Sequence, residues 1–353
     1  MSPALLVLEP GLITAVQDLG RTGYQRLGIP VSGALDPVAL RVANVVVGNP
    51  QDTAGLEIAL VGPMFEVQAD SVRVAMCGGA SALTIESGDG ETRRVKALAS
   101  VTLERGARFR IGSIEGAAVA YLAIAGGIDL PPFMGSLSTY VRGGFGGLEG
   151  RALRKGDALP LVRATAPDRA DLQLEGMELP PARIVRVIPG PQDDWFTPEA
   201  MATFLGSEYV VTRDADRMGL RLDGPRLTHA KGANIVSDAI APGAIQVPGN
   251  GLPIVLLADR QATGGYPKIA TVISADLPAL GRVSPGAKLR FEAVTLDEAE
   301  AARMQLETRL RGLSRDLTPV RPSGPDLARL LSHNLISGVT DAQHADDEGS
   351  LTD

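Results

Sequence analysis

The chain has 353 residues and a formal net charge of -7, with 44% hydrophobic and 21% charged residues, which is ordinary for a soluble globular protein. It shows no basic stripe, which argues against nucleic acid and anionic membrane surfaces as main partners. Its single cysteine, Cys77, leaves no disulfide framework within the chain. No stretch has the pattern of a signal peptide or a membrane span, so we expect a cytoplasmic protein.

The first half is predicted to consist of short strands with one buried helix. A strand is expected over residues 5–8, and a helix over 37–47 with Asp36 as its N-cap and Gly48 just beyond its end. Short apolar runs separated by glycines then extend from 71 to 125. Because no helix-length amphipathic segments separate these runs, they indicate an all-β barrel or sandwich.

The second half repeats this pattern after a mixed-charge, proline-bearing stretch. We expect a first subdomain over 1–165, a linker over 166–182 and a second subdomain over 183–294. Thr197 is expected to N-cap a short helix. Strands are expected at 208–211, 235–237, 244–247, 254–258, 270–274 and 288–291. The sequence RGARFRI at 105–111 resembles PGAKLRF at 285–291, which hints that both halves end on a similar turn and strand.

The C-terminal region, 295–353, is expected to hold one helix and a partly disordered tail. Thr295 and Glu298 have the spacing of a capping box for a helix that runs to about Leu310. The end of the tail is rich in Asp, Ser and Gly, which is typical of disorder.

Several familiar kinds of reaction site leave no mark on the sequence. The three histidines have no metal-ligand spacing, and His229 is more often a structural residue than a catalytic base in such a setting. No phosphate-binding loop and no nucleophile elbow is present. No metal is therefore expected, and any chemistry would rest on Asp, Glu, Lys, Arg, Tyr, Ser or Thr.

The polar loop 259–268, DRQATGGYPK, is the strongest candidate site. It joins two apolar runs and gathers a carboxylate, a guanidinium, an amide, a hydroxyl, a phenol and an ammonium. A long polar turn is an equally good interpretation of the loop alone. As a site, its cations would neutralise an oxyanion, and its carboxylate would position or deprotonate the substrate. The predicted catalytic residues are Asp259, Arg260, Tyr266 and Lys268, and the predicted binding residues nearby are Gln246, Gln261, Thr263, Gly264 and Gly265.

Three further stretches carry candidate binding residues, and each has a structural alternative. QDLGR could orient a carboxylate-bearing substrate or form a local ion pair. GSLSTYVR could bind an anion through backbone amides or be a solvated loop. RDADRMGLRL could be a solvated charged face, or burial of its apolar residues could force its charges to pair. The candidates in these stretches are Asp18, Arg21, Ser136, Thr139, Tyr140, Arg217 and Arg221.

These stretches together resemble one family. Seven motifs occur in order between about Gly11 and Phe291: VQDLGRTGYQRLGIPVSGALD, VANVVVGNP, LEIALVGP, AGGIDLPPFMGSLSTY, RDADRMGLRLDGP, SDAIAPGAIQVPGNGLPIVLLADRQATGGYPKIATVISADL and GRVSPGAKLRF. They are similar to the carboxyltransferase-type family that includes the C component of bacterial 5-oxoprolinase, the second component of allophanate-hydrolase-like proteins and part of urea carboxylase. The sequence departs at Ala262, where the family often has a second threonine, and so lacks one hydroxyl donor.

The resemblance implies a mainly β fold of two cyclophilin-like β-barrel subdomains with a few short helices. It also implies a smaller partner of related fold, similar to the B component of 5-oxoprolinase, and an active site in or near their shared canyon. The favoured function is a subunit of an ATP-dependent 5-oxoprolinase that opens 5-oxoproline to L-glutamate, with a third component and with ATP as substrate of the complex. The lack of a biotin-carrier Met-Lys-Met sequence and of an ATP-grasp-sized region mildly supports this choice.

Two alternatives remain. One is the carboxyltransferase component of a biotin-dependent carboxylase that acts on urea or a similar small amide, with its biotin carrier on another chain. The other is a non-catalytic regulatory partner of a protein similar to the B component. The regulatory role is the least favoured, because it would need no loop such as 259–268.

Overall fold

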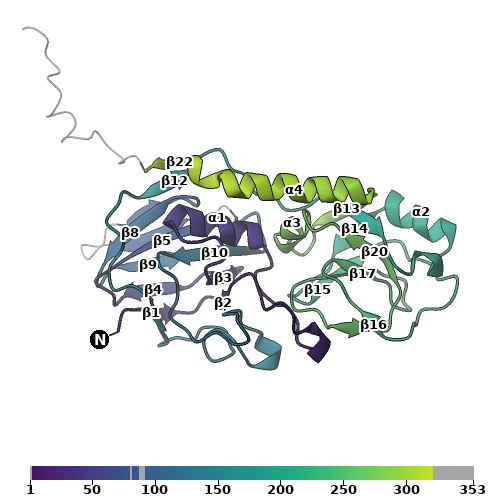
Figure 1. The fold of residues 1–353 in the computed structure, drawn as a ribbon, viewed down its shortest axis with the longest axis horizontal. Helices are drawn as coiled ribbons and strands as arrows, with labels where there is room; N and C mark the ends of the chain where they lie inside the picture. Colours follow the sequence, from purple (N-terminus) through teal and green to yellow (C-terminus); the bar gives the residue numbers. More distant parts are fainter. Residues whose placement is uncertain (1, 80–81, 87–91, 321–353) are drawn as a thin grey trace, which may run out of the picture. The chain divides into compact units, whose positions relative to one another are not determined.

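The computed structural model describes residues 2–79, 82–86 and 92–320, and this part of the chain is mainly β (Figure 1). In its first half, two antiparallel sheets face each other across one hydrophobic core. The first sheet has the order β11-β1-β4-β9-β6-β7, with β1 (Ala4–Glu9), β4 (Met64–Val67), β6 (Leu83–Glu86), β7 (Thr92–Val95), β9 (Arg108–Ile111) and β11 (Ala158–Pro160). The second has the order β2-β3-β10-β5-β8, with β2 (Ile13–Gln17), β3 (Gly55–Ala59), β5 (Ser71–Cys77), β8 (Ser100–Glu104) and β10 (Val119–Ile124).

Helix α1 (Pro37–Val47) covers the outer face of the second sheet (Figure 1). Strand β10 is apolar throughout because both of its faces are buried. Leu122 faces the core between the sheets, and Tyr121 faces α1. Both predicted ends of α1 are confirmed. The carboxylate of Asp36 accepts bonds from the first turn, and Gly48 ends the helix with φ 75°.

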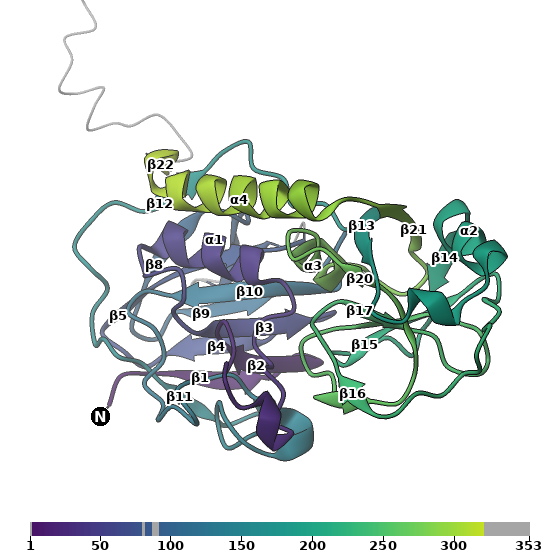
Figure 2. The same ribbon diagram turned by 45° about the vertical axis from the view of Figure 1, so that its right-hand side comes forward.

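The second half contains a closed seven-stranded barrel around its own core. Its order is β13-β20-β17-β18-β15-β14-β21, with β13 (Ile184–Pro189), β14 (Glu208–Val211), β15 (Gly219–Asp223), β17 (Ala244–Gln246), β18 (Ile254–Leu256), β20 (Lys268–Val272) and β21 (Lys288–Ala293). Helices α2 (Pro198–Gly206) and α3 (Leu277–Gly281) pack beside it, and Thr197 caps α2 as predicted. A short ribbon of β16 (Asp238–Ala239) and β19 (Thr263–Gly264) lies outside the barrel wall (Figure 2).

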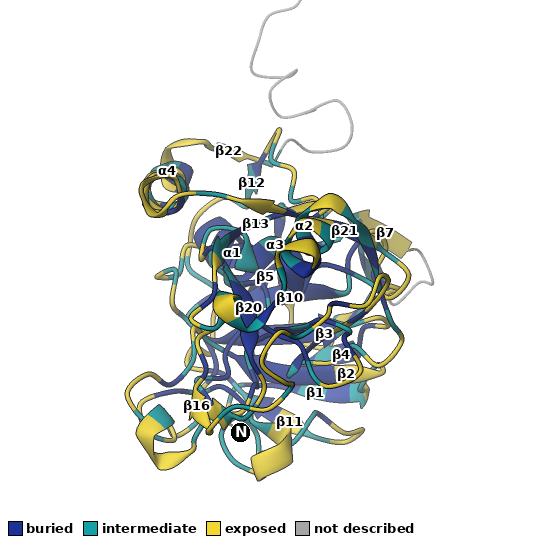
Figure 3. Cartoon of the chain, turned by 90° about the vertical axis from the view of Figure 1, so that its right-hand side faces the viewer, coloured by how far each residue is buried: buried dark blue, intermediate teal, exposed yellow. Residues whose placement is uncertain are grey.

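The remaining elements are one long helix, a short strand pair and several single-turn helices. Helix α4 (Leu296–Gly312) begins with the predicted Thr295–Glu298 capping box and runs along both halves (Figure 1). Its outward surface is largely exposed (Figure 3), while Glu307 pairs with Arg41 of α1 at 2.9 Å. The segment expected as a linker, 166–182, carries β12 (Leu172–Leu174), which pairs with β22 (Leu317–Pro319). Four single-turn 3-10 helices are η1 (Gln25–Leu27), η2 (Val141–Gly143), η3 (Asp193–Trp195) and η4 (Leu313–Arg315).

Most predicted strands of the second half lie within two residues of the observed ones. The strand expected at 235–237 is wrong, since the ribbon begins only at Asp238. Val236 is almost fully exposed, so its apolar neighbourhood did not indicate burial. The echo between 105–111 and 285–291 corresponds to two similar units, because Gly106 and Gly286 both take positive φ before β9 and β21. The predicted disorder of the tail beyond 320 lies outside the described residues.

Candidate functional site

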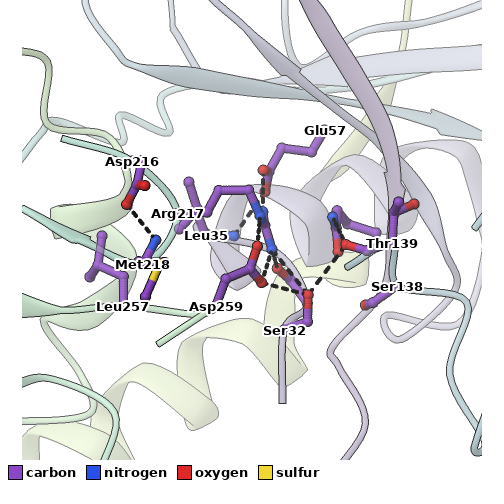
Figure 4. Close-up of polar contacts among 12 residues, drawn as sticks. Ser32, Leu35, Glu57, Ser138, Thr139, Asp216, Arg217, Met218, Leu257 and Asp259 are labelled. Carbon is purple, nitrogen blue, oxygen red and sulfur yellow. Dashed lines mark hydrogen bonds and ion pairs between the residues drawn. The ribbon is translucent and has the colours of Figure 1, made fainter. Parts of the chain in front are cut away.

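A buried ion cluster, here called the clasp, joins the two halves and consists of Ser32, Glu57, Arg217 and Asp259 (Figure 4). Arg217 reaches from the second half into the first. Its Nε donates to Asp259 Oδ2 at 2.8 Å, its Nη1 donates to Glu57 Oε1, and its Nη2 donates to the carbonyl of Gly33 at 2.6 Å. Ser32 Oγ donates to Asp259 Oδ1 at 2.6 Å. The clasp therefore connects the first-half loop after β2 with the chain segment that follows β18.

The clasp continues into the first half through a tyrosine. Glu57 Oε2 accepts bonds from Tyr121 Oη at 2.6 Å and from the backbone of Leu35 at 2.9 Å. Burial and the neighbouring carboxylates raise the pKa of Tyr121 well above its ordinary value. Burial would lower the pKa of Arg217, but Glu57 and Asp259 outweigh that effect and raise it. The guanidinium is thus a permanent cation in this place.

Two residues of the clasp, Arg217 and Asp259, were predicted to contact substrate. Both oxygens of Asp259 accept bonds from Arg217, and Oδ1 accepts the Ser32 hydroxyl as well. The alternative that the charges around Arg217 are buried and paired agrees with this geometry. A part for Asp259 in proton transfer remains a prediction, and its visible contacts are those of a structural carboxylate.

The second set of predicted residues lies on the outer wall of the barrel. Strand register places Arg221 opposite Ile254, Ile254 opposite Gln246, and Gln246 opposite Lys268. We call these four residues the row. Adjacent strands are about 4.8 Å apart, so the row spans roughly 15 Å. The preceding residue in β17, Ile245, points into the barrel core. Because successive side chains of a strand point to opposite faces, the side chain of Gln246 lies on the outside.

The β16–β19 ribbon covers the buried end of the row, at Gln246 and Lys268. Lys268 Nζ donates to Asp238 Oδ2 at 3.0 Å, with 3% of the lysine side chain exposed and 50% of the aspartate side chain. The bond from Lys268 lowers the pKa of Asp238. A Cβ at Gly264 would lie 2.7 Å from Gln246 Nε2, so a larger residue there would force the glutamine amide to shift. Gln261, an exposed residue, donates from Nε2 to Gln246 Oε1 at 3.4 Å.

Arg260 is a cation without a carboxylate partner among the described residues, and it bonds Ile240, which packs in one apolar cluster with Ile254 of the row. Only 2% of the residue is exposed. Its Nε donates to the carbonyl of Ile240, and its Nη1 to that of Leu257, both at 3.2 Å. No ion pair to it is found in the described part of the chain, and neither its Nη2 nor Gln246 Nε2 has a hydrogen-bond partner there. Burial lowers the pKa of Arg260 to about 10. These unpartnered donors would suit an anion or a carbonyl oxygen.

The other residues predicted around the loop are less enclosed. Tyr266 is 41% exposed, and Thr263 is exposed in β19. The carbonyl of Gly265 accepts a bond from Ile235 N at 2.8 Å, which fixes the ribbon to the preceding segment. Arg221 is exposed at the far end of the row.

The candidates of the first half form a cluster of their own. Asp18 accepts bonds from Ser136 Oγ and Leu137 N, both at 2.7 Å. Thr139 Oγ1 donates to the carbonyl of Val16 at 2.9 Å, while Tyr140 packs against Phe145 in a tilted arrangement, with ring centroids 5.3 Å apart. The local ion pair between Asp18 and Arg21, one of the two alternatives above, is not among the ion pairs of the described residues. Instead, Arg21 Nη2 donates to the carbonyl of Ser138.

Sequence reasoning missed Ser32, Glu57 and Asp238. Ser32 lies within the GIPVSGALD stretch that carries the family resemblance, so its place in a motif was the available signal. Glu57 and Asp238 lie in LEIALVGP and SDAIAPGA, which also carry the resemblance, so the same signal was available for both.

A cavity of about 330 Å³ lies away from all these residues. Its lining includes Cys77, Leu98, Met177 and Leu179. Burial raises the pKa of the Cys77 thiol, which disfavours the reactive thiolate. Within residues 2–79, 82–86 and 92–320, no cluster of His, Cys, Asp and Glu is arranged to hold a metal ion. In the same residues, no helix has the length and apolar character needed to cross a bilayer.

Comparison with known proteins agrees with the motifs. The chain is 37% identical to the C component of 5-oxoprolinase from Escherichia coli over 85% of its own length and 94% of the relative. It is 35% identical to the Haemophilus influenzae protein of the same name, over 88% and 97%. The urea amidolyase structure from K. lactis superposes with a TM-score of 0.82 at 30% identity, covering 89% of this chain and only 20% of that one. Residues 27–293 match the carboxyltransferase domain, subdomain A and B, and the chain therefore belongs to that family.

Proposed function

We propose that this chain is a subunit of an ATP-dependent 5-oxoprolinase, which opens 5-oxoproline to L-glutamate. The observation that carries the proposal is the extent of the match: 94% of the E. coli C component is covered, against a fifth of the urea amidolyase chain. A protein similar to the B component and a third component are the proposed partners, ATP is the proposed co-substrate of the assembled complex, and the cytoplasm is the expected location.

The row with Arg260 is the proposed binding site for the lactam. 5-Oxoproline carries a carboxylate and a ring carbonyl, and both accept hydrogen bonds. Arg260 Nη2 and Gln246 Nε2 are donors without a partner among the described residues, and Lys268 offers a buried ammonium beside them. A lactam is a stabilised amide and resists hydrolysis. Phosphorylation of its oxygen by ATP would make attack by water feasible. Cationic donors held in a buried site stabilise the negative charge that develops on that oxygen.

Asp238 has a defined part in this proposal. It is the carboxylate that Lys268 contacts, and it stands at the exposed rim of the ribbon. A ligand carboxylate would compete with Asp238 for the same ammonium. Lys268 therefore distinguishes an acidic lactam from a neutral amide such as urea.

The test is ATP-dependent loss of 5-oxoproline by the chain assembled with its partner proteins. Arg260→Gln and Lys268→Met are expected to abolish turnover, while Lys288→Met, an exposed lysine of β21 outside the row, serves as the matched control. Turnover that survives both buried substitutions would contradict the site. No turnover by the complete assembly would contradict the function.

A biotin-dependent carboxyltransferase acting on urea or a similar amide is the second candidate. The TM-score of 0.82 to a urea amidolyase structure favours it. In that case biotin on another chain would be the cofactor, and avidin would block activity. Avidin-insensitive turnover would rule this candidate out.

A further inference from the structure

Arg21 is buried in the first half and has no place in the proposed function. Only 1% of the residue is exposed. Its Nη2 donates to the carbonyl of Ser138, and its Cζ lies 5.1 Å from the centre of the Phe145 ring. Its Nε and Nη1 have no hydrogen-bond partner among the described residues. A guanidinium in such a place usually has a carboxylate partner, because burying an uncompensated charge is costly.

Neither nearby carboxylate supplies that partner. The oxygens of Asp18 accept bonds from Gly20 N, Leu137 N and two serine hydroxyls. Asp259 is held in the clasp. Burial lowers the pKa of Arg21, while Asp18 and Asp259 act in the opposite direction from a distance without contacting it. The electrostatic compensation of Arg21 is therefore incomplete.

A buried acceptor that is unpartnered in the described part of the chain lies beside the loop 138–146, which also contacts Arg21. Gln17 Nε2 donates to the carbonyl of Thr139 at 3.0 Å, next in sequence to the carbonyl that anchors Arg21. Gln17 Oε1 has no partner among the described residues. The loop also approaches closely at Gly146, where a Cβ would lie 2.7 Å from Arg21 Nη2. Cationic donors and one neutral acceptor are thus collected beneath one loop.

We infer that Arg21 and Gln17 bind a small oxyanion that keeps an O–H group, of the hydrogen phosphate or bicarbonate class. The anionic oxygens accept from Arg21, and the O–H donates to Gln17 Oε1. Sulfate has similar size but no O–H at neutral pH, so it would leave the glutamine oxygen without a donor. This site is distinct from the row, because Arg21 and Gln17 bond carbonyl groups of the first half, whereas Arg260 bonds carbonyl groups of the second half.

The test uses the full chain alone, without partner proteins or 5-oxoproline. Phosphate, bicarbonate and sulfate are titrated at constant ionic strength, and binding is followed by the rise in Tm and by the 1H–15N resonance of the Arg21 Nε–H. We expect saturable binding of phosphate or bicarbonate and at least fivefold weaker binding of sulfate. Comparison of the two favoured anions identifies which one the site prefers.

Three variants assign the binding to its residues. Arg21→Gln is expected to abolish saturable binding, and Gln17→Met to remove the preference over sulfate. Arg73→Gln is the matched control, since it also removes a buried guanidinium with an unpartnered nitrogen among the described residues, in β5 and outside both sites. Absence of saturable binding in the wild type, equal binding of sulfate, or binding that survives Arg21→Gln would overturn the inference. If Arg21→Gln does not fold, the shift of the wild-type Arg21 resonance decides the question.

Discussion

Replacement of Arg217 by methionine should lower the free energy of unfolding and let the two halves of the protein unfold independently. Methionine retains much of the length of the arginine side chain but none of its donors. It would leave Glu57 and Asp259 facing the same buried space without a cation, and their side chains are only 7% and 8% exposed. Both lost ion pairs involve this junction, so the change acts there rather than on either hydrophobic core.

The expected loss of unfolding free energy follows from the burial of the pair. Removal of one partner from a buried ion pair costs about 3–5 kcal/mol, because the remaining charge is left uncompensated. That is a large share of the roughly 5–15 kcal/mol by which a domain is stable. Ser32→Ala removes one hydroxyl from Asp259 and should cost only about 1–2 kcal/mol. A triple variant, Glu57→Gln with Arg217→Met and Asp259→Asn, has no charge left and should recover part of the loss.

Urea denaturation with two probes measures this effect. The only tryptophan, Trp195, lies in the second half and reports on the barrel, while circular dichroism reports on both halves. In the wild type the two transitions should coincide, and in Arg217→Met they should separate because the halves unfold independently. A loss below about 1 kcal/mol, well under the range for a broken buried pair, or a triple variant as unstable as the single one, would refute the account of the clasp.

Three other changes follow from the same structure. Burial lowers the pKa of Arg260 to about 10, so the unfolded chain binds more protons between that pH and the ordinary pKa of arginine. Stability should therefore rise with pH in this range, while the 5-oxoproline affinity of the assembled complex falls. Arg260→Gln should remove both slopes in pH-dependent denaturation and binding assays. Asp238→Asn should tighten 5-oxoproline binding several-fold in calorimetry by freeing Lys268, and weaker binding would contradict the proposed competition. Glu307→Gln should lower the unfolding free energy by about 1 kcal/mol through its bidentate bond to Arg41, and faster amide exchange confined to α4 would identify the site of the loss.

Local features of the fold were predictable because their causes lie within a few residues. Asp36, Thr197 and Thr295 each cap a helix by accepting hydrogen bonds from backbone amides of its first turn. All three were identified from the sequence. The density of functional groups in 259–268 was visible in the same way. The failed strand at 235–237 shows the limit, since an apolar pair such as Ile235 and Val236 resembles a strand whether or not a core covers it.

The partners of the candidate residues were not predictable, because they depend on contacts between distant segments. Ser32 and Asp259 are 227 positions apart, and Glu57 and Arg217 are 160 apart. No spacing rule connects them. The row likewise requires the order and register of four strands, and a shift of one residue would turn Gln246 into the barrel core.

The contrast between Asp259 and Arg260 explains how one short segment can serve two purposes. These neighbours could have neutralised each other, yet the carboxylate is bound to Ser32 and Arg217 while the guanidinium contacts only carbonyl groups of its own half. The bond from Ser32 N to the carbonyl of Ala258 fixes the segment just before they diverge. Because Asp259 is committed to the junction, Arg260 keeps an uncompensated charge beside the row. Loss of the clasp should therefore release Asp259 toward Arg260, so that Arg217→Met weakens anion binding at the row without changing a residue of that row.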